Sequence, residues 1–305
     1  MSSKFPSWPA RLGTECRDVL ELIVLPGLAA VLPWRFCFWV FKRLARIQCL
    51  YREPCEAALL QARVRGWAGE DEAHWIWVRR LVTLVDHADH YLGLWRSDAW
   101  MKRHMTVQGT WPEHQNGLLL LTFHWGAGFW GLRHAGAHGL QPHALVASLG
   151  SQAYEGRTVL SWYASSRNRH VARCLGSPTI DVAQQLKHVI RALRKNHSLL
   201  GVLDVPADEV KASIGVNVLG MNARVPRGLL RLAVDQKVPV VLYVTGLDTA
   251  TGLRHLVIHA PVVYTDVDDM AAGVFIELEK IIAQDSPAWH FWAVADRFFS
   301  PPTPI

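Results

Sequence analysis

A short apolar run that ends in a histidine constrains the fold of this chain more than any other stretch. Residues 118–123 are four leucines, a threonine and a phenylalanine, the composition of a strand buried on both faces of a sheet. His124 follows directly, and Gly126 and Gly128 open the next element. Because open α/β sheets place their chemistry where central strands end, this stretch favours a functional turn. The alternative is a core histidine in a tight strand-to-helix turn.

The chain after residue 140 alternates segments that predict strands with segments that predict helices. Strands are expected at residues 144–147, 199–203, 238–244 and 255–259, and helices at residues 154–174, 182–194, 227–234 and 270–283. This order predicts an α/β fold in which helices flank a mainly parallel central sheet. Residues 56–100 carry apolar side chains at spacings of three and four and predict further helix.

Residues 19–41 form a mostly apolar stretch that two prolines, a glutamate and an arginine interrupt. The length would suffice for a spanning helix of about 20 residues, but the prolines argue against one straight span. Lys42 and Arg43 follow, and tryptophans lie where an interfacial belt would place them. We expect residues 1–50 to be a kinked, membrane-associating helical element and residues 51–305 to be the α/β domain. The alternative for the apolar stretch is a buried pair of helices.

The charge balance of the chain favours anionic partners. Lysine and arginine total 32 against 26 aspartates and glutamates, which gives a net charge of +6, and tryptophan is abundant at 14. No long basic run and no nucleic-acid-binding signature is present, so a membrane surface is favoured over nucleic acid. The five cysteines include no C-x-x-C pair, which argues against a disulfide framework or a zinc site.

Two groups of side chains have spacings that invite a metal interpretation. The segment from Asp86 to His90 reads Asp-His-Ala-Asp-His, but no further acidic cluster accompanies it, so a solvated or capping role is favoured. His134, His138 and His143 lack an obvious carboxylate partner and are expected at the surface. We therefore expect no metal and no cofactor.

A second apolar run, residues 199–203, ends in Asp204. If the two runs form neighbouring parallel strands, His124 and Asp204 emerge at one edge of the sheet. Between them in sequence lies a basic segment with Arg167 and Arg169, whose guanidinium groups suit phosphate or carboxylate recognition. The alternative for these arginines is an exposed basic helix face.

Taken in order, these features resemble the bacterial lipid A late acyltransferase family. The motifs are His124 after a leucine-rich strand, Ser-Arg167-Asn-Arg169, the apolar run to Asp204, and the tail Trp289-His-Phe-Trp292 with Arg297-Phe-Phe. The apolar amino-terminal segment fits as well, and residues 215–226 with 229–241 look like the segment that completes the family's sheet. The resemblance extends over residues 20–300, and it rests on the order in which the motifs occur along the chain.

The resemblance implies a membrane-associated enzyme of lipid biosynthesis at the cytoplasmic face of the inner membrane. Such an enzyme would move a fatty acyl or related acyl group from an acyl carrier protein or acyl-CoA thioester to a hydroxyl of a lipid, glycolipid or specialised metabolite. His124 would be the general base. Arg167 and Arg169 would hold an anionic part of a substrate, and the N–H groups of Gly126 and Gly128 would stabilise the oxyanion.

One position departs from the family's motif, which places an Asp or Glu after His and four further residues. In this chain that position is Phe129. Another carboxylate, with Asp204 the best candidate, or a backbone carbonyl could orient the imidazole instead. The alternative is a non-catalytic acyl- or carrier-binding protein built on the same fold.

Overall fold

The centre of the protein is a seven-stranded sheet in the order β1-β9-β8-β2-β5-β3-β4. The computed structural model describes residues 8–113, 117–146, 154, 156–182, 186–206 and 212–299. The strands are β1 (Met105–Gln108), β2 (Leu119–Thr122), β3 (His143–Val146), β4 (Ile180–Asp181), β5 (Leu199–Val202), β8 (Val240–Leu247) and β9 (Arg254–Ile258). Neighbouring strands are parallel except for β8 and β9. The predicted α/β class with a mainly parallel sheet is confirmed.

The two apolar runs found in the sequence are neighbouring strands at the centre of this sheet. β2 pairs with β5 in parallel, with Leu119 opposite Leu199 and Thr122 opposite Val202. This adjacency is a condition that the sequence left open, and the structure meets it. Because parallel neighbours end at the same side, His124 and Asp204 leave the sheet together.

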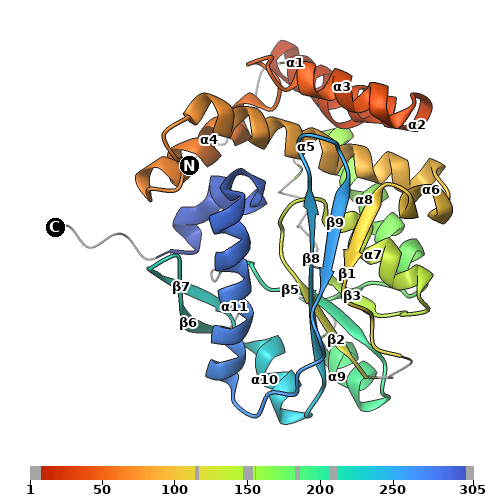
Figure 1. The fold of residues 1–305 in the computed structure, drawn as a ribbon, viewed down its shortest axis with the longest axis vertical. Helices are drawn as coiled ribbons and strands as arrows, with labels where there is room; N and C mark the ends of the chain where they lie inside the picture. The colour runs from red at the N-terminus through yellow and green to blue at the C-terminus, as the bar shows by residue number, and fades with distance from the viewer. Residues whose placement is uncertain are drawn as a thin grey trace.

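Helices cover both faces of the sheet because successive strand residues point to opposite sides. Leu120 of β2 lies in the smaller of two apolar cores, and Leu121 lies in the larger one. Figure 1 shows α7 and α8 on one side of the sheet and α10 and α11 on the other. The flanking helices are α7 (Gly128–Ala137), α8 (Thr158–Leu175), α9 (Leu186–Arg194), α10 (Gly228–Asp235) and α11 (Val267–Gln284).

A long helix, α5 (Glu72–Trp95), lies across the end of the sheet (Figure 1). It follows α4 (Arg52–Val64) and precedes the short α6 (Asp98–Lys102). The helix predicted over residues 56–100 is thus broken between α4 and α5. The break contains Gly66 and Gly69, whose φ angles of +77° and +68° an ordinary helix does not allow.

The amino-terminal element packs on the outer side of α5. It comprises α1 (Trp8–Asp18), a π-helical turn (Val19–Val24), α2 (Leu25–Val31) and α3 (Trp34–Leu44). Tyr91 of α5 donates to the carbonyl of Leu22 at 2.7 Å, and Arg96 donates to the carbonyl of Leu32 at 2.9 Å. The chain turns at Pro33, so the predicted kink is confirmed. Within the described residues, no helix combines the length and apolar character of a membrane span.

Residues 215–226 do not complete the sheet, so that expectation is wrong. They belong to β6 (Ser213–Val218) and β7 (Met221–Pro226), which pair only with each other in a separate two-stranded sheet. Leu219 and Gly220 both have positive φ, +57° and +73°, which is the geometry of a tight two-residue hairpin turn. The following predicted strand does enter the large sheet as β8.

Candidate active site

Asp204 holds both the backbone and the side chain of His124. The backbone N–H of His124 lies 2.9 Å from each carboxylate oxygen, and its Nδ1 lies 3.1 Å from Oδ1. The Asp204 side chain has no exposed surface. The structure therefore brings together the two side chains that the sequence placed at the ends of neighbouring strands.

A third donor completes the surroundings of this carboxylate. Nε1 of Trp289 donates to Oδ2 of Asp204 at 2.8 Å, and the indole itself is buried. The N–H groups of His124 and Trp289 thus provide hydrogen-bond partners for both oxygens of this buried carboxylate. Trp289 lies in the turn between two 3-10 helices, η4 (Ser286–Ala288) and η5 (His290–Arg297).

The contact with Asp204 fixes the tautomer of His124. Because an ionised carboxylate only accepts hydrogen bonds, Nδ1 carries the hydrogen and Nε2 carries the lone pair. The His124 side chain is 40% exposed, and its ring meets that of Phe291 edge-on with centroids 4.3 Å apart. The arrangement leaves a basic nitrogen accessible on a rigidly held imidazole.

The turn after His124 requires glycine at position 126. Gly126 has a φ of +62°, and a Cβ atom there would lie 2.4 Å from the carbonyl oxygen of Thr245. Its N–H donates to the carbonyl of Ala288 at 3.0 Å, so this group is not available to an oxyanion. Gly128 opens α7, and among the described residues no hydrogen-bond acceptor faces its N–H. Of the two predicted oxyanion donors, only Gly128 retains that capacity.

Phe129 occupies the position where the family's motif has its acid. Its side chain is buried, and its ring lies 4.4 Å from that of His170 and 6.4 Å from that of His90, measured between centroids. Phe129 therefore packs into the interface of α7 with α5 and α8. Asp204, from the end of β5, supplies the carboxylate beside His124.

The two candidate arginines of α8 lie in different surroundings. Arg167 makes two hydrogen bonds to Asp86 of α5, at 2.7 and 3.1 Å, and a weaker one to the hydroxyl of Tyr163 at 3.3 Å. Burial opposes ionisation of Asp86, yet the adjacent Arg167 lowers the pKa of that carboxyl below its usual value. Arg169 is exposed on the helix. The structure does not bring Arg167 and Arg169 together as a clamp.

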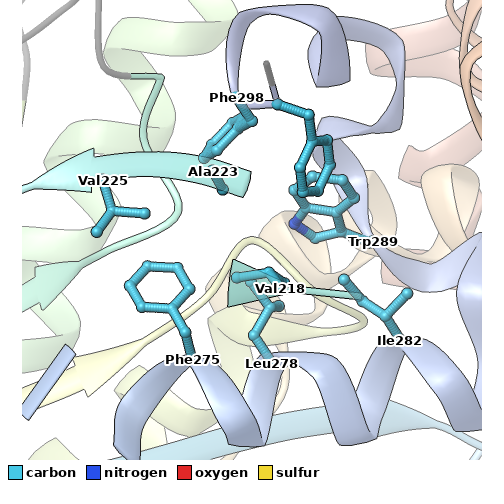
Figure 2. Close-up of a pocket in the computed structure, with 9 residues that line it drawn as sticks. Val218, Ala223, Val225, Phe275, Leu278, Ile282, Trp289 and Phe298 are labelled. Carbon is cyan, nitrogen blue, oxygen red and sulfur yellow. The ribbon is translucent and has the colours of Figure 1, made fainter. Parts of the chain in front are cut away.

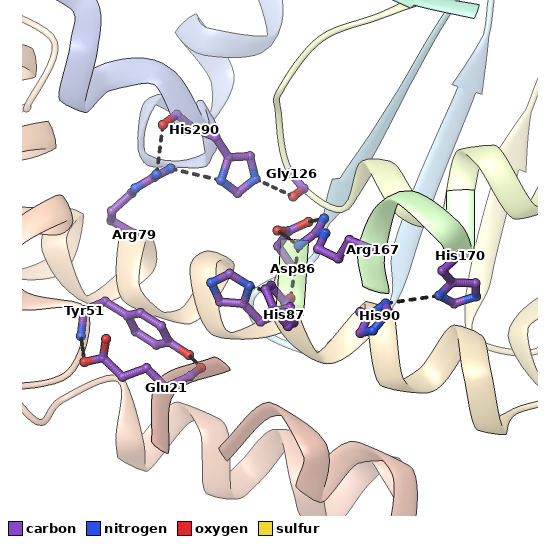
Figure 3. Close-up of polar contacts among 11 residues, drawn as sticks. Glu21, Tyr51, Arg79, Asp86, His87, His90, Gly126, Arg167, His170 and His290 are labelled. Atoms are coloured by element: carbon purple, nitrogen blue, oxygen red, sulfur yellow. Dashed lines mark hydrogen bonds and ion pairs between the residues drawn. The ribbon is translucent and has the colours of Figure 1, made fainter. Parts of the chain in front are cut away.

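The Asp86–His90 segment is not solvated, so that expectation is wrong. Figure 3 shows Asp86, His87 and His90 in a polar layer between α5 and α8, whereas the buried Asp89 pairs with Arg254 of β9. His90 lies 3.2 Å from Ser166 and from Nδ1 of His170, and His87 lies 2.8 Å from Tyr163. Burial lowers the pKa of His87 and His90 to about 3. In the described part of the chain, no three His, Cys, Asp or Glu side chains are grouped as a metal site would require.

An apolar pocket lies on the other side of Trp289 (Figure 2). It is enclosed by the β6–β7 hairpin, α11 and the tail, and its lining includes Val218, Phe275 and Phe298. The cavity measures about 10 Å³, which is about the space that one water molecule needs. In this conformation the pocket stabilises the Trp289 ring and does not accommodate an acyl chain.

Searches against protein-family models and against curated proteins find no match to this chain. Two residues of the geometry around His124 were not predicted. The sequence indicates Trp289 only as part of the tail motif, and it gives no signal for Arg79, whose guanidinium donates to the carbonyl of Trp289 at 3.0 Å.

Proposed function

We propose that this protein is a membrane-associated acyltransferase with His124 as its general base. The acyl group comes from the thioester of an acyl carrier protein or acyl-CoA, and the acceptor is a hydroxyl of a lipid, glycolipid or specialised metabolite. The observation that carries the proposal is the 3.1 Å contact between Asp204 and Nδ1 of His124. It supplies the orienting carboxylate that the motif position of Phe129 lacks.

In the proposed reaction, Nε2 of His124 removes the proton of the acceptor hydroxyl as its oxygen attacks the thioester carbonyl. The developing oxyanion is stabilised by the N–H of Gly128 at the start of α7. When the intermediate collapses, the carbon–sulfur bond breaks and the leaving thiolate takes the proton from the imidazolium. Asp204 remains ionised throughout and stabilises the imidazolium by its charge.

The amino-terminal element presents a surface suited to the membrane interface. Val31 is 75% exposed, and Phe36 and Trp39 are each about half exposed and stack with centroids 5.9 Å apart. The guanidinium of Arg43 lies 5.3 Å from the Trp39 ring. Aromatic side chains beside basic ones favour the headgroup region of an anionic bilayer. We place this surface on the cytoplasmic face of the inner membrane.

Vesicle flotation tests the membrane surface. Phe36→Ser with Trp39→Ser removes two exposed aromatic rings and should reduce binding to anionic vesicles severalfold. Ile276→Ser is the matched control because Ile276 is equally exposed, at 52%, on α11. Equal binding by both variants would place the membrane contact elsewhere.

Transfer of a labelled acyl group tests the reaction. Purified protein, membranes and acyl carrier protein charged with a radiolabelled acyl chain should yield labelled lipid, and His124→Ala should abolish the product without changing the melting temperature. The same mixture tests the non-catalytic alternative. If the wild type and His124→Ala both bind acyl carrier protein saturably and the wild type yields no labelled product, the protein is a binding protein and not an enzyme.

A further inference from the structure

The tail around Trp289 pairs with the turn that carries His124. The N–H of His290 donates to the carbonyl of His124 at 2.8 Å, and the N–H of Gly126 donates to the carbonyl of Ala288 at 3.0 Å. The side chain of His290 adds a contact of 2.9 Å from Nε2 to the carbonyl of Gly126. The candidate base thus lies in a turn whose backbone is fixed by a segment far away in sequence.

Arg79 of α5 in turn fixes this tail (Figure 3). Nη1 donates to the carbonyls of Pro287 and Trp289 at 3.2 and 3.0 Å, and Nη2 donates to that of His290 at 3.1 Å. Nη1 also lies 3.5 Å from Nδ1 of His290. One guanidinium therefore binds three carbonyls within four residues of the tail segment, the same segment that contacts Asp204 and the His124 turn.

The surroundings of Arg79 are unusual for a buried cation. Its side chain is 5% exposed, and no carboxylate in the described part of the chain lies within ion-pair distance of it. Burial lowers the pKa of this guanidinium. A buried charge without an ionic partner is costly, so its hydrogen bonds to the tail carbonyls must compensate.

The tautomer of His290 follows from the same contacts. Its Nε2 faces a carbonyl oxygen and so carries the hydrogen, which leaves the lone pair on Nδ1 toward Arg79. Burial, with the charge of Arg79, lowers the pKa of His290 to about 4. His290 is therefore a neutral donor to the Gly126 carbonyl.

We infer that Arg79 and His290 are positioning residues for the His124–Asp204 pair, an inference that rests on the proposed function. Arg79 acts through the tail carbonyls, and the indole of Trp289 transmits this placement to Asp204. His290 acts directly on the backbone of the His124 turn. Neither side chain touches the reacting atoms.

Steady-state kinetics of acyl transfer test the inference with a matched pair of variants. Arg79→Lys keeps the charge but cannot reach three carbonyls, so kcat should fall by about 10²-fold with little change in KM, because small displacements of a catalytic group are that costly. Arg80→Lys is the control, since Arg80 is equally buried in the same helix and donates to Gln48 at 3.3 Å. Equal kcat values for the two lysine variants would overturn the inference.

A double-mutant cycle separates positioning from a merely structural role. If Arg79 acts through Asp204, Arg79→Lys should cost less than about threefold in an Asp204→Asn background, because the contact it positions is already lost. The full loss in both backgrounds would show that Arg79 acts independently of the pair.

Two substitutions test His290. His290→Gln retains an N–H for the Gly126 carbonyl and should preserve activity, whereas His290→Phe lacks this donor and should not.

A spectroscopic measurement keeps the inference testable even if no acyl transfer is found. Nitrogen-15 shifts of the imidazole of His124, assigned with His124→Ala and recorded at pH 9, report its tautomer. The wild type and Arg80→Lys should show hydrogen on Nδ1, whereas Arg79→Lys should show a mixture of tautomers. A folded Arg79→Lys protein with the wild-type nitrogen shifts would refute the inference. If Arg79→Lys shows a mixture of tautomers but the wild type transfers no acyl group, the inference holds and only the proposed function is refuted.

Discussion

Replacing Asp204 with asparagine should reverse the tautomer of His124. The amide has one accepting oxygen where the carboxylate has two, and its nitrogen must take the place of Oδ1 or of Oδ2. At Oδ2 it would face the N–H of Trp289 at 2.8 Å, and the indole cannot change its donor character. At Oδ1 it would face Nδ1 of His124, which can accept once its hydrogen moves to Nε2. The second placement costs less, and it removes the lone pair from the reacting nitrogen.

The expected loss of turnover follows from this change of tautomer. In a Ser-His-Asp triad the equivalent substitution leaves the geometry intact and lowers kcat about 10⁴-fold, which corresponds to about 5.5 kcal/mol. The stability of the fold should fall much less, by about 1–3 kcal/mol, because one buried charge-assisted contact is weakened. Single-turnover transfer of a labelled acyl group and urea unfolding measure the two effects separately.

Phe129→Glu provides the complementary variant. Position 129 lies against His170 and His90, so a glutamate there would be buried among imidazoles at a cost of several kcal/mol. We expect it to restore no activity to the Asp204→Asn protein. An Asp204→Asn protein with more than a tenth of wild-type turnover would refute the tautomer argument, as would rescue by Phe129→Glu.

Three further predictions concern stability. Gly126→Ala should lower the free energy of unfolding in urea by about 2 kcal/mol or more, because position 126 has a positive φ and a Cβ there would meet the Thr245 carbonyl. Gly128→Ala is the control, since a Cβ at position 128 meets nothing within 4 Å and should change this free energy by less than about 0.5 kcal/mol. Equal effects of the two substitutions would contradict the described turn. Arg167→Ala should cost about 2 kcal/mol because it leaves the mostly buried carboxylate of Asp86 unpaired, while Arg169→Ala should be nearly silent. Comparable melting temperatures would show that the ion pair is dispensable. Burial lowers the pKa of His170 to about 4, so between about pH 6.5 and 4 the unfolded chain is protonated at this residue while the folded protein is not, and stability should fall as the pH drops through this range. His170→Phe should reduce the slope of stability against pH by up to about 1.4 kcal/mol per pH unit. An unchanged slope would contradict the lowered pKa of His170.

The sheet and the facing pair were predictable because each has a local signal. Residues 118–123 and 199–203 are short apolar runs of the kind that buried strands have, and the polar residue after each marks its end. The sequence left open whether the two strands are parallel neighbours, but that condition, once met, is enough to place His124 beside Asp204. The register of the two strands, with Thr122 opposite Val202, agrees with this reasoning.

The surroundings of the pair were not predictable because they depend on contacts between distant segments. A helix with Asp86, His87, Asp89 and His90 looks the same in sequence whether those side chains meet water or another helix. In this fold α5 is covered on one side by the amino-terminal element and on the other by α7 and α8, so its polar side chains are withdrawn from water. Similarly, no local pattern tells that the guanidinium of Arg79 binds carbonyls some 208 residues later.

The pairing of the tail with the His124 turn has a consequence for the order of folding. The contact between His290 and Gly126 spans 164 residues, whereas β2 and β5 are joined across about half that distance. Contacts of long sequence separation form late, because closing the longer loop costs more chain entropy. On a ribosome, β2 and β5 can pair before the indole that binds Asp204 has been released from the ribosome. The imidazole should therefore acquire its fixed tautomer only at the last stage of folding, after the scaffold around it is complete, and protection of the Gly126 amide against hydrogen exchange should appear later than that of Leu120.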